Sequence, residues 1–335
     1  MKNVIITGAS GFVGSFIVEE CLKKGYRTFA GIRKTSSKKY LTEKNTQIIY
    51  LNLNDKEELK NQILEIIKYT GKIHYIIHNA GVTKVKKITD FYKNNYNTTK
   101  NLIEAILELK IELEKFIYVS SLAVYGCGNK QTLEPIKITD TPLPNTEYGK
   151  SKLKAEEFIK SKIEIPWLIF RPTGIYGPRD VDYFVYFKTI QNGFEPYIGF
   201  KTQYLTFIYV KDLVKLLTDA LESNIVHKSY FVSDGNTYTS EDFANIVKNI
   251  LNKKTIRFRV PLWIVKIIVV ILETIYKPFG KTPVLNTDKY NILSTTNWKC
   301  DISETINDFN FVPQYNLEKG IYETIQWYKK QGWLK

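Results

Sequence analysis

The chain has 335 residues, of which 44% are hydrophobic and 24% charged, and this composition indicates a globular protein and excludes a disordered or collagen-like chain. The net charge of +14 comes almost wholly from scattered lysines without a nucleic-acid-binding motif, which favours a basic, solvated surface over nucleic-acid binding and leaves attraction to an anionic membrane open. The three cysteines, Cys21, Cys127 and Cys300, are too few and too far apart for a disulfide framework or a metal site.

The chain begins with an apolar strand, expected over residues 2–7, which is followed by a glycine-rich loop and a helix over residues 12–23. Gly8 permits a tight turn, Gly11 lets the backbone approach a diphosphate, and Gly14 lets the helix pack closely on the strand. The residues expected to bind the diphosphate of a dinucleotide are Thr7, Gly8, Ser10, Gly11, Phe12, Val13 and Gly14. The alternative is a glycine-rich turn that binds nothing.

The turn after the second strand is basic. Chains that prefer NAD usually carry an acidic residue at this point, about 20 residues beyond the loop, to bind the ribose hydroxyls. Residues 30–37 contain no acid, whereas Arg33, helped by Lys34 and Ser36, could bind a 2′-phosphate. The sequence therefore favours NADP(H), with NAD(H) as the alternative cofactor, unless Arg33 belongs to a basic surface turn only.

Strand and helix signals alternate through the first half of the chain. Further strands are expected over residues 28–32, 46–51, 73–78, 116–120 and 167–170. Helices are expected over residues 56–68, 91–109 and 146–162, the last with Thr146 as its N-cap. This alternation predicts an α/β fold in which a doubly wound parallel sheet of the Rossmann type is joined by a smaller, mostly C-terminal α/β domain.

Two reactive side chains, Tyr148 and Lys152, are four residues apart on the helix over 146–162 and can point into one cleft. A phenol has an unperturbed pKa of about 10, and a nearby ammonium and the nicotinamide cation would together lower the pKa of Tyr148. Tyr148 could then act as general acid in ketone reduction or as general base in alcohol oxidation. The alternative is an ordinary Tyr/Lys pair on a solvated helix.

The second half of the chain is less regular. The predicted Rossmann domain covers residues 1–177 and about 206–235, and the predicted substrate-binding domain covers about 178–205 and 236–335. Within the latter, residues 262–272 are apolar except for Lys266, but too few to span a bilayer, for which about 20 residues are needed. This segment is either a buried helix, an interfacial helix or the wall of a lipid channel, and Arg257, Arg259 and Lys266 around it would suit lipid head groups.

In order and spacing, the motifs of this chain resemble those of the extended short-chain dehydrogenase/reductases, which include the NAD-dependent epimerases and dehydratases. The resemblance covers essentially the whole chain. Its motifs are the glycine loop, His78-Asn79-Ala80-Gly81, Asn95 with Thr99 to Leu102, Ser120 to Gly126, the Tyr148/Lys152 pair, Arg171-Pro172, Tyr176 to Arg179 and Phe207 to Asp212.

The resemblance assigns roles to several residues. It implies that Ser121, in preference to its neighbour Ser120, orients the substrate carbonyl and that Lys152 also holds the nicotinamide ribose. His74 and His78 could be catalytic bases, but we expect His78 at a strand end beside the cofactor loop and structural roles for His74 and His227. The further cofactor-binding residues that the resemblance implies are Asn52, Leu53, Asn79, Ala80, Gly81, Asn95, Ser120, Tyr148, Pro172 and Thr173. Asn52 replaces the usual adenine-binding aspartate, although its amide oxygen can still accept a hydrogen bond. Members of the family often pair through a four-helix interface, which implies a homodimer built on residues 91–109 and 146–162.

Two departures from the family pattern concern the substrate. Gly174 and Leu205 stand where sugar-nucleotide members usually carry Asn and Arg, and the tail, with Trp298, Trp327 and Trp333, is similar to that of 3β-hydroxysteroid dehydrogenases and 3-oxo-ceramide reductases. We therefore expect an oxidoreductase acting on a ketone, or the corresponding alcohol, of an amphiphilic small molecule. The alternatives are an NAD-dependent nucleotide-sugar epimerase or dehydratase, and a nucleotide-binding regulatory module without turnover.

The expected location follows from what precedes the first strand. No signal peptide is present there, so we expect a cytoplasmic protein, with peripheral association at the inner face of the membrane as a further expectation.

Overall fold

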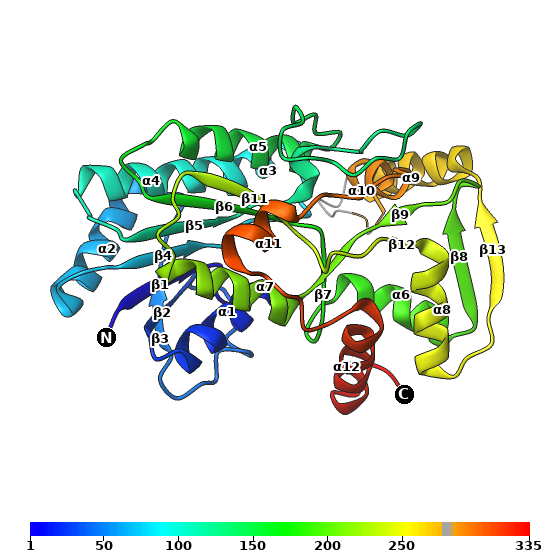
Figure 1. The fold of residues 1–335 in the computed structure, drawn as a ribbon, viewed down its shortest axis with the longest axis horizontal. Coiled ribbons are helices and arrows are strands. Elements are labelled where there is room, and N and C mark those ends of the chain that lie inside the picture. Colours follow the sequence, from blue (N-terminus) through cyan, green and yellow to red (C-terminus); the bar gives the residue numbers. More distant parts are fainter. Residues whose placement is uncertain (277–282, 284) are drawn as a thin grey trace.

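The computed structural model describes residues 1–276, 283 and 285–335. Its centre is a parallel sheet of seven strands in the order β11-β6-β5-β4-β1-β2-β3 (Figure 1). In that order the strands are Lys228–Val232, Trp167–Pro172, Lys115–Val119, Tyr75–His78, Asn3–Thr7, Arg27–Ile32 and Gln47–Tyr50. The inner strands are almost continuously apolar because helices cover both faces of the sheet.

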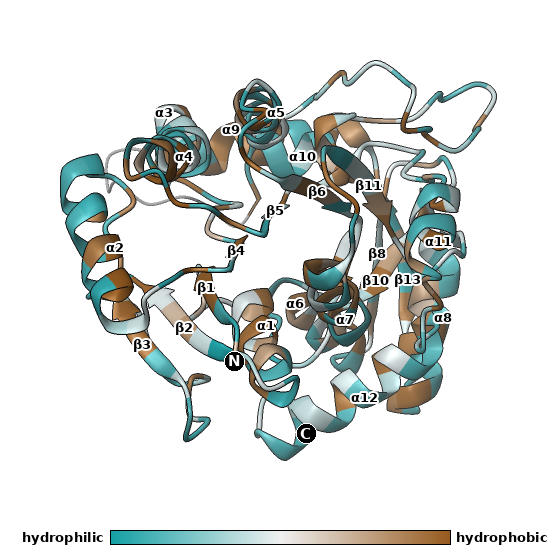
Figure 2. Cartoon of the chain, turned by 60° about the vertical axis from the view of Figure 1, so that its left-hand side comes forward, coloured by the Kyte–Doolittle hydropathy of each residue, from teal (hydrophilic) through white to brown (hydrophobic). Residues whose placement is uncertain are grey.

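Helices cover the sheet on both sides, as Figure 2 shows. One face carries α1 (Phe12–Lys23) and α7 (Val210–Asp219), and the other carries α2 (Lys56–Thr70), α4 (Thr98–Glu108) and α5 (Glu147–Lys160). Each face has its own apolar core between helices and strands. The predicted doubly wound Rossmann fold is confirmed.

The predicted helix over residues 91–109 is wrong as a single element. The chain forms a short helix α3 (Ile88–Phe91), a π-helical segment η1 (Tyr92–Asn97) and only then α4. In the wider turn, the buried Asn95 side chain reaches away from its own helix to Val82 and Ser151. Such π-turns occur mostly at functional sites, and their sequence signal is weak.

A third apolar core lies beyond the carboxyl ends of the strands, between α6, α8 and α12. These helices are Asp182–Gln191, Ser240–Leu251 and Leu317–Lys330. Three two-stranded pairs accompany them: β7 (Gly174–Tyr176) with β10 (Phe207–Tyr209), β9 (Tyr204–Leu205) with β12 (Tyr238–Thr239), and β8 (Phe194–Ile198) with β13 (Ile256–Val260). The remaining short elements are η2 (Leu122–Val124), η3 (Ala220–Glu222), α10 (Thr287–Leu293) and α11 (Ser303–Phe309). Of the predicted substrate-binding domain, residues 277–282 and 284 lie outside the described residues.

The apolar segment over residues 262–272 forms part of helix α9 (Leu262–Tyr276). Only Val265 and Val269 are buried in this helix, so the interpretation as a buried core helix is wrong. None of the helices in the described part of the chain is long and apolar enough to cross a membrane.

Candidate active site

The glycine loop packs closely against neighbouring backbone at the start of α1. Gly8 has a φ of +67°, and a Cβ there would lie 2.8 Å from the Cα of Ala80; a Cβ on Gly14 would lie 2.1 Å from the Gly8 carbonyl oxygen. Gly11 is the N-cap of α1 and provides no side-chain cap, so the first N–H groups of the helix stay available to an anion. These residues therefore fit a dinucleotide diphosphate.

The start of α5 is held by hydrogen bonds from two directions, and this fixes the position of Tyr148. The Thr146 hydroxyl accepts a hydrogen bond from the Gly149 N–H at 3.0 Å, which confirms Thr146 as the N-cap. The Asp288 carboxylate, on α10, accepts from the N–H groups of Glu147 at 3.1 Å and Tyr148 at 3.0 Å. Free N–H groups at a helix start favour an acidic partner of this kind.

Lys152 lies one turn along α5 and is buried beside the end of β5 and the loop after β4. Its Nζ donates to the carbonyl oxygen of Val119 at 2.7 Å and lies 4.0 Å from the centre of the Tyr118 ring. A Cβ on Gly81 would be only 3.9 Å from this Nζ. Burial lowers the pKa of Lys152 to about 7, against the opposing effect of the Glu156 carboxylate. Lys152 can therefore take up or release a proton near neutral pH.

Tyr148 and Ser121 come together at the carboxyl end of β5. Burial raises the pKa of the Tyr148 phenol to about 12, and a hydrogen bond with Ser121 acts in the opposite direction. The prediction that Lys152 lowers this pKa is wrong for the protein by itself, because the ammonium is directed at Val119 and the Tyr118 ring. The phenol is consequently protonated at neutral pH and is placed to donate.

A buried ion pair next to this site was not predicted. Glu156 receives hydrogen bonds from the Arg171 guanidinium, at 3.0 Å from Nε and 2.6 Å from Nη2, and from the Ser120 hydroxyl at 2.6 Å. Arg171 lowers the pKa of Glu156 against the effect of burial. The signal in the sequence was the spacing, because Tyr148, Lys152 and Glu156 follow one another at four-residue intervals on one helix face.

The histidines are not placed for acid–base chemistry. His78 ends β4 and is fully buried, with its two ring nitrogens 2.7 Å from the Thr7 hydroxyl and 2.9 Å from the Thr99 hydroxyl. Burial lowers the pKa of His78 to about 3, so that this ring is neutral and ties the cofactor loop to α4. His74 and His227 bind backbone groups of Asn3 and Ile165, in keeping with structural roles.

The loop after β4 is held by Asn95. The Asn95 side chain accepts from the Val82 N–H at 2.8 Å, and donates to the Val82 carbonyl at 3.1 Å and to the Ser151 hydroxyl at 2.9 Å. These hydrogen bonds position Gly81, whose neighbours Asn79 and Ala80 border Gly8. A role of Asn95 toward the cofactor would then act through this loop.

Several other predicted cofactor residues lie at the carboxyl edge of the sheet. Arg33 and Ser36 form an exposed turn after β2, closed by a hydrogen bond from the Ser36 N–H to the Arg33 carbonyl. The Asn52 amide donates to Glu58 of α2, and Leu53 precedes that helix. Thr173, which follows Pro172, donates hydrogen bonds to the backbone carbonyl of Val232 on the edge strand β11.

Gly174 follows these residues on β7 and has no room for a side chain. A Cβ at this position would lie 2.4 Å from the Tyr183 hydroxyl and 3.1 Å from the Phe207 ring. Tyr183 also contacts the Phe243 ring, with ring centres 5.7 Å apart. The surroundings of the site on this side are therefore aromatic.

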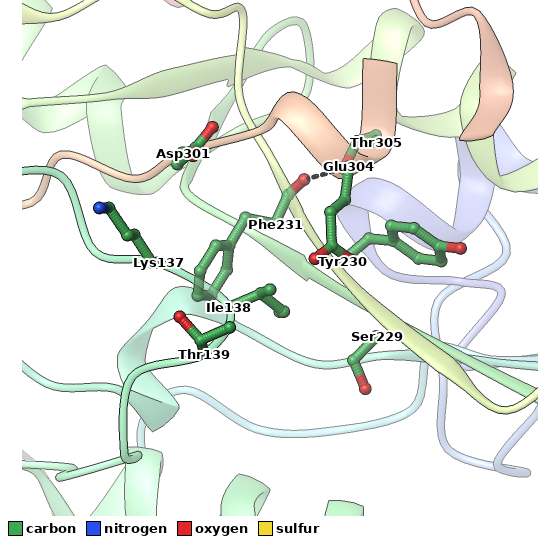
Figure 3. Close-up of a pocket in the computed structure, with 9 residues that line it drawn as sticks. All are labelled: Lys137, Ile138, Thr139, Ser229, Tyr230, Phe231, Asp301, Glu304 and Thr305. Atoms are coloured by element: carbon green, nitrogen blue, oxygen red, sulfur yellow. Dashed lines mark hydrogen bonds between the residues drawn. The ribbon is translucent and has the colours of Figure 1, made fainter. Parts of the chain in front are cut away.

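A pocket of about 160 Å³ lies elsewhere, at the outer strand β11 and helix α11 (Figure 3). It is lined by residues 137–139 and 229–231 together with Asp301, Glu304 and Thr305, and the Thr305 hydroxyl closes one side by donating to the Phe231 carbonyl. It contains none of the predicted catalytic residues, so it is separate from the candidate active site.

Comparison with known proteins gives the family. Residues 4–232 match the NAD dependent epimerase/dehydratase family. The chain is 24% identical over 338 residues to a UDP-glucose 4-epimerase of Vibrio cholerae, covering 97% of this chain and 95% of the relative. It is 26% identical over 343 residues to a decarboxylating sterol-4-alpha-carboxylate 3-dehydrogenase of Dictyostelium discoideum, covering 96% and 100%.

The fold is shared with a solved dTDP-glucose 4,6-dehydratase of Bacillus anthracis in complex with NAD, with a TM-score of 0.77, 19% identity and coverage of 100% and 99% of the two chains. The matched region contains the glycine loop, Ser121, Tyr148 and Lys152. The chain therefore belongs to the NAD-dependent epimerase/dehydratase family of extended short-chain dehydrogenases/reductases and is an NAD(P)-dependent oxidoreductase of that type.

Proposed function

We propose that this enzyme reduces a ketone, or oxidises the corresponding alcohol, on an amphiphilic, lipid-like substrate. The observation that carries the substrate class is the packing of Gly174 against Tyr183 and Phe207, which leaves no space for a polar, nucleotide-binding side chain. The assignment of Ser121, Tyr148 and Lys152 as catalytic residues is part of the same proposal.

The chemistry follows from the protonation states of the side chains. A bound nicotinamide supplies the hydride in reduction and accepts it in oxidation. The protonated Tyr148 phenol donates a proton to the oxygen of the substrate carbonyl, which the Ser121 hydroxyl orients. Lys152, with a pKa of about 7, would hold the ribose, and the Tyr148 phenolate regains its proton from solvent. Oxidation of the alcohol uses the same groups in the reverse order.

The substrate class is argued from the side chains around Gly174. Rings of Tyr176, Tyr183, Phe207 and Phe243 lie within 6.5 Å of one another in successive pairs. Leu205, which replaces the Arg expected in sugar-nucleotide members, belongs to the partly buried strand β9 of the same region. Such surroundings favour an apolar group over a diphosphate, because burial of a charge without a partner is costly.

For the cofactor we propose a preference for NADP(H). The Arg33 guanidinium has no acidic partner within the described residues, and it follows β2, whose end pairs with Thr7 of the glycine loop. The solved relative mentioned above was obtained with NAD, so that NAD(H) is the alternative. A guanidinium without an acidic partner is suited to bind a phosphate by two parallel hydrogen bonds.

The second candidate function is nucleotide-sugar epimerisation or dehydration, with NAD retained through the cycle. It is favoured by the UDP-glucose 4-epimerase relative, which matches nearly the whole chain. The sterol dehydrogenase relative, of equal coverage, favours the lipid-like substrate. A regulatory module without turnover is the least supported, since Ser121, Tyr148 and Lys152 are all present.

The deciding experiment is an assay of cofactor oxidation and reduction. Purified protein is incubated with NADPH or NADH and a panel of keto-lipids, keto-steroids and nucleotide sugars, and the 340-nm absorbance of the cofactor is followed, with product analysis for the nucleotide sugars. We expect turnover of a keto-lipid or keto-steroid with NADPH. Turnover of nucleotide sugars alone, with NAD bound, would contradict the proposal.

We further propose a homodimer, with residues 178–205 and 236–335 of each subunit binding the substrate. The two subunits would pair through η1, α4 and α5. This pairing surface is supported by Tyr92, Tyr96 and Phe158, which are half-buried aromatic side chains of η1 and α5. Sedimentation velocity should give a species of twice the chain mass, and a monomer at micromolar concentration would contradict the dimer. Cytoplasmic location with peripheral binding to the inner membrane face is the corresponding proposal for the cell.

A further inference from the structure

Helix α9 exposes its apolar side chains along one face. Trp263 is 64% exposed, Ile267 50% and Val270 56%, and Ile271 and Ile275 continue the same face toward the end of the helix. At 100° per residue these positions form a single stripe along the helix, opposite the buried Val265 and Val269. An exposed stripe of this size on a protein surface marks an interaction site.

The surface continues beyond the helix onto the neighbouring strand pair. Leu262 packs against Gly199, and the adjacent Phe200 is 69% exposed. Figure 1 places α9 at the end of the molecule that carries β8 and β13, with α10 toward α5. The anchor surface, defined by Phe200, Trp263, Ile267, Val270, Ile271 and Ile275, is thus at the outside of the molecule.

Charges beside this surface are positive. Lys201 and Lys266 are exposed, and neither has an acidic partner among residues 1–276, 283 and 285–335. Arg257 and Arg259, expected from the sequence to meet lipid head groups, instead pair with Glu195 at 3.0 Å and with Glu241 at 2.6 Å. Of the three cations expected at lipid head groups, only Lys266 therefore has no acidic partner among the described residues, and Lys201 joins it.

We propose that the anchor surface inserts α9 flat into the interface of an anionic bilayer, with Lys201 and Lys266 at the level of the head groups. An apolar stripe along a helix too short to span, next to exposed cations, is the arrangement of an interfacial helix. A second copy of the chain fits less well, because a symmetric contact would bring each Lys266 toward the other across a desolvated surface.

The anchor is connected to the candidate active site through α10. The Glu273 carboxylate, on α9, accepts from the Thr287 N–H at 2.8 Å and from its hydroxyl at 3.0 Å. The next residue, Asp288, holds the Tyr148 N–H. Two successive sets of hydrogen bonds therefore connect a bilayer bound at α9 with α5. We propose that an amphiphilic substrate passes from the bilayer to the site on α5. Only this consequence rests on the proposed function.

The test is binding of the full chain to vesicles in the absence of cofactor and substrate. Flotation is measured with vesicles of phosphatidylcholine alone and with 30% phosphatidylglycerol, at low and at physiological salt. We expect binding to the anionic vesicles, weakened by salt, and a fall of about five-fold for each of Lys201→Gln and Lys266→Gln. Ile267→Asp and Ile271→Asp should reduce binding at least ten-fold.

A matched control comes from another exposed isoleucine. Ile163→Asp places the same charge at a side chain that is 75% exposed and lies outside the anchor surface, and it should bind vesicles as the wild type does. Circular dichroism and thermal midpoints check that each variant is folded. A second measurement does not depend on introducing a charge. The tryptophan emission of the wild type should shift to shorter wavelength when vesicles are added, and the shift should be smaller in Trp263→Phe.

Two results would overturn the proposal. One is a wild type that does not bind anionic vesicles at low salt. The other is that the α9 variants bind vesicles as well as Ile163→Asp does. This result would also count against the proposal if the α9 variants were found to abolish a dimer while vesicle binding stayed the same. The substrate panel is independent of this assay, so a nucleotide-sugar substrate together with vesicle binding would contradict the proposed function and leave the anchor standing.

Discussion

Helices α5 and α9 have nearly the same length and opposite surfaces. Seven of the 14 residues of α5 are charged, yet it buries Lys152 and Glu156 with 3% and 0% of their surface exposed. Only two of the 15 residues of α9 are charged, yet Trp263 and Ile267 face solvent. Composition alone would place the two helices the other way round.

The difference shows two departures from the tendency of apolar residues to be buried and charged residues to be exposed. In α5, the energetic cost of burying charge is reduced by an ion pair with Arg171 and by the proton that Lys152 can lose near pH 7. In α9, no protein side chain in the described part of the chain covers the exposed stripe. Departures of either kind are expected at sites that bind or react.

The largest expected effect tests whether the burial in α5 serves catalysis. Tyr148→Phe should lower kcat by about 10²–10⁴, because the phenol provides the proton, and should change the Kd of the cofactor by only a few-fold. Turnover on the best substrate of the panel and cofactor titration by fluorescence measure the two quantities. A variant that turns over near the wild-type rate would remove Tyr148 from the mechanism.

The second prediction concerns the buried ion pair. Glu156→Ala should reduce the free energy of unfolding by about 3–5 kcal/mol, because Arg171 is left charged and unpaired in the core. The double variant Glu156→Leu with Arg171→Leu should be less destabilised than Glu156→Ala. Urea denaturation of the wild type and the two variants measures this order, and an equal loss in both variants would mean that the cavity, not the unpaired charge, dominates.

The third prediction sharpens the role of Lys152 through pH. The pKa of Lys152 is about 7 in the folded protein and about 10.4 in an unfolded chain. Between these values the unfolded chain binds the extra proton, so this residue makes the free energy of unfolding rise with pH, by roughly 1.4 kcal/mol per unit at most. Below pH 7 Lys152 is charged in both states, and burial of its ammonium then reduces the free energy of unfolding by the largest amount.

Lys152→Met removes this contribution and is the matched variant. It should be more stable than the wild type at pH 7, and the advantage should shrink as the pH is raised toward 10. Chemical denaturation of the cofactor-free proteins at intervals of half a pH unit gives both curves. Parallel curves would show that Lys152 keeps its proton throughout this range.

Much of the Rossmann half was predictable because its patterns are local. The glycine loop is followed by a helix over Phe12–Lys23 as expected, and the strand ends differ from prediction by one or two residues. The motif pairs Tyr148 with Lys152 on one helix turn, and helical geometry places both on one face. Here sequence order and spatial neighbourhood coincide.

What was missed depends on contacts between distant parts of the chain. Strand β11 pairs with β6 far earlier in the sequence, and Asp288 reaches the start of α5 from 140 residues away. The direction of the Tyr148 pKa was wrong because desolvation is a property of the assembled core. The exposure of α9 could not be read from its composition, which suits a core equally well.

The fourth prediction concerns Arg33, at the cofactor edge of the Rossmann half. Arg33→Ala should weaken NADPH binding about ten-fold or more and leave NADH binding unchanged, because a charged hydrogen bond to the 2′-phosphate is lost. Dissociation constants of both cofactors, in wild type and variant, test it. Lys34→Ala, in the same exposed turn, is the control and should have the smaller effect. Equal loss for NADPH and NADH would make Arg33 a surface residue without a cofactor preference.

The smallest effect is expected at the link between the two helices compared above. Asp288 accepts hydrogen bonds from the N–H groups of Glu147 and Tyr148, and the Thr146 hydroxyl accepts one from that of Gly149. Both residues thus act as acceptors for N–H groups at the start of α5 that have no partner within the helix. Asp288→Ala should therefore cost about 1 kcal/mol of unfolding free energy, similar to Thr146→Ala.

Asp288 differs from Thr146 in that it also ties α10, and with it α9, to α5. If that link matters, Asp288→Ala should speed amide hydrogen exchange in α10 as well as at the start of α5, whereas Thr146→Ala should act on α5 alone. Hydrogen exchange followed by mass spectrometry distinguishes the two patterns. Identical patterns would mean that α5 and α9 are independent, and that the bilayer proposed for α9 has no route to Tyr148 through Asp288.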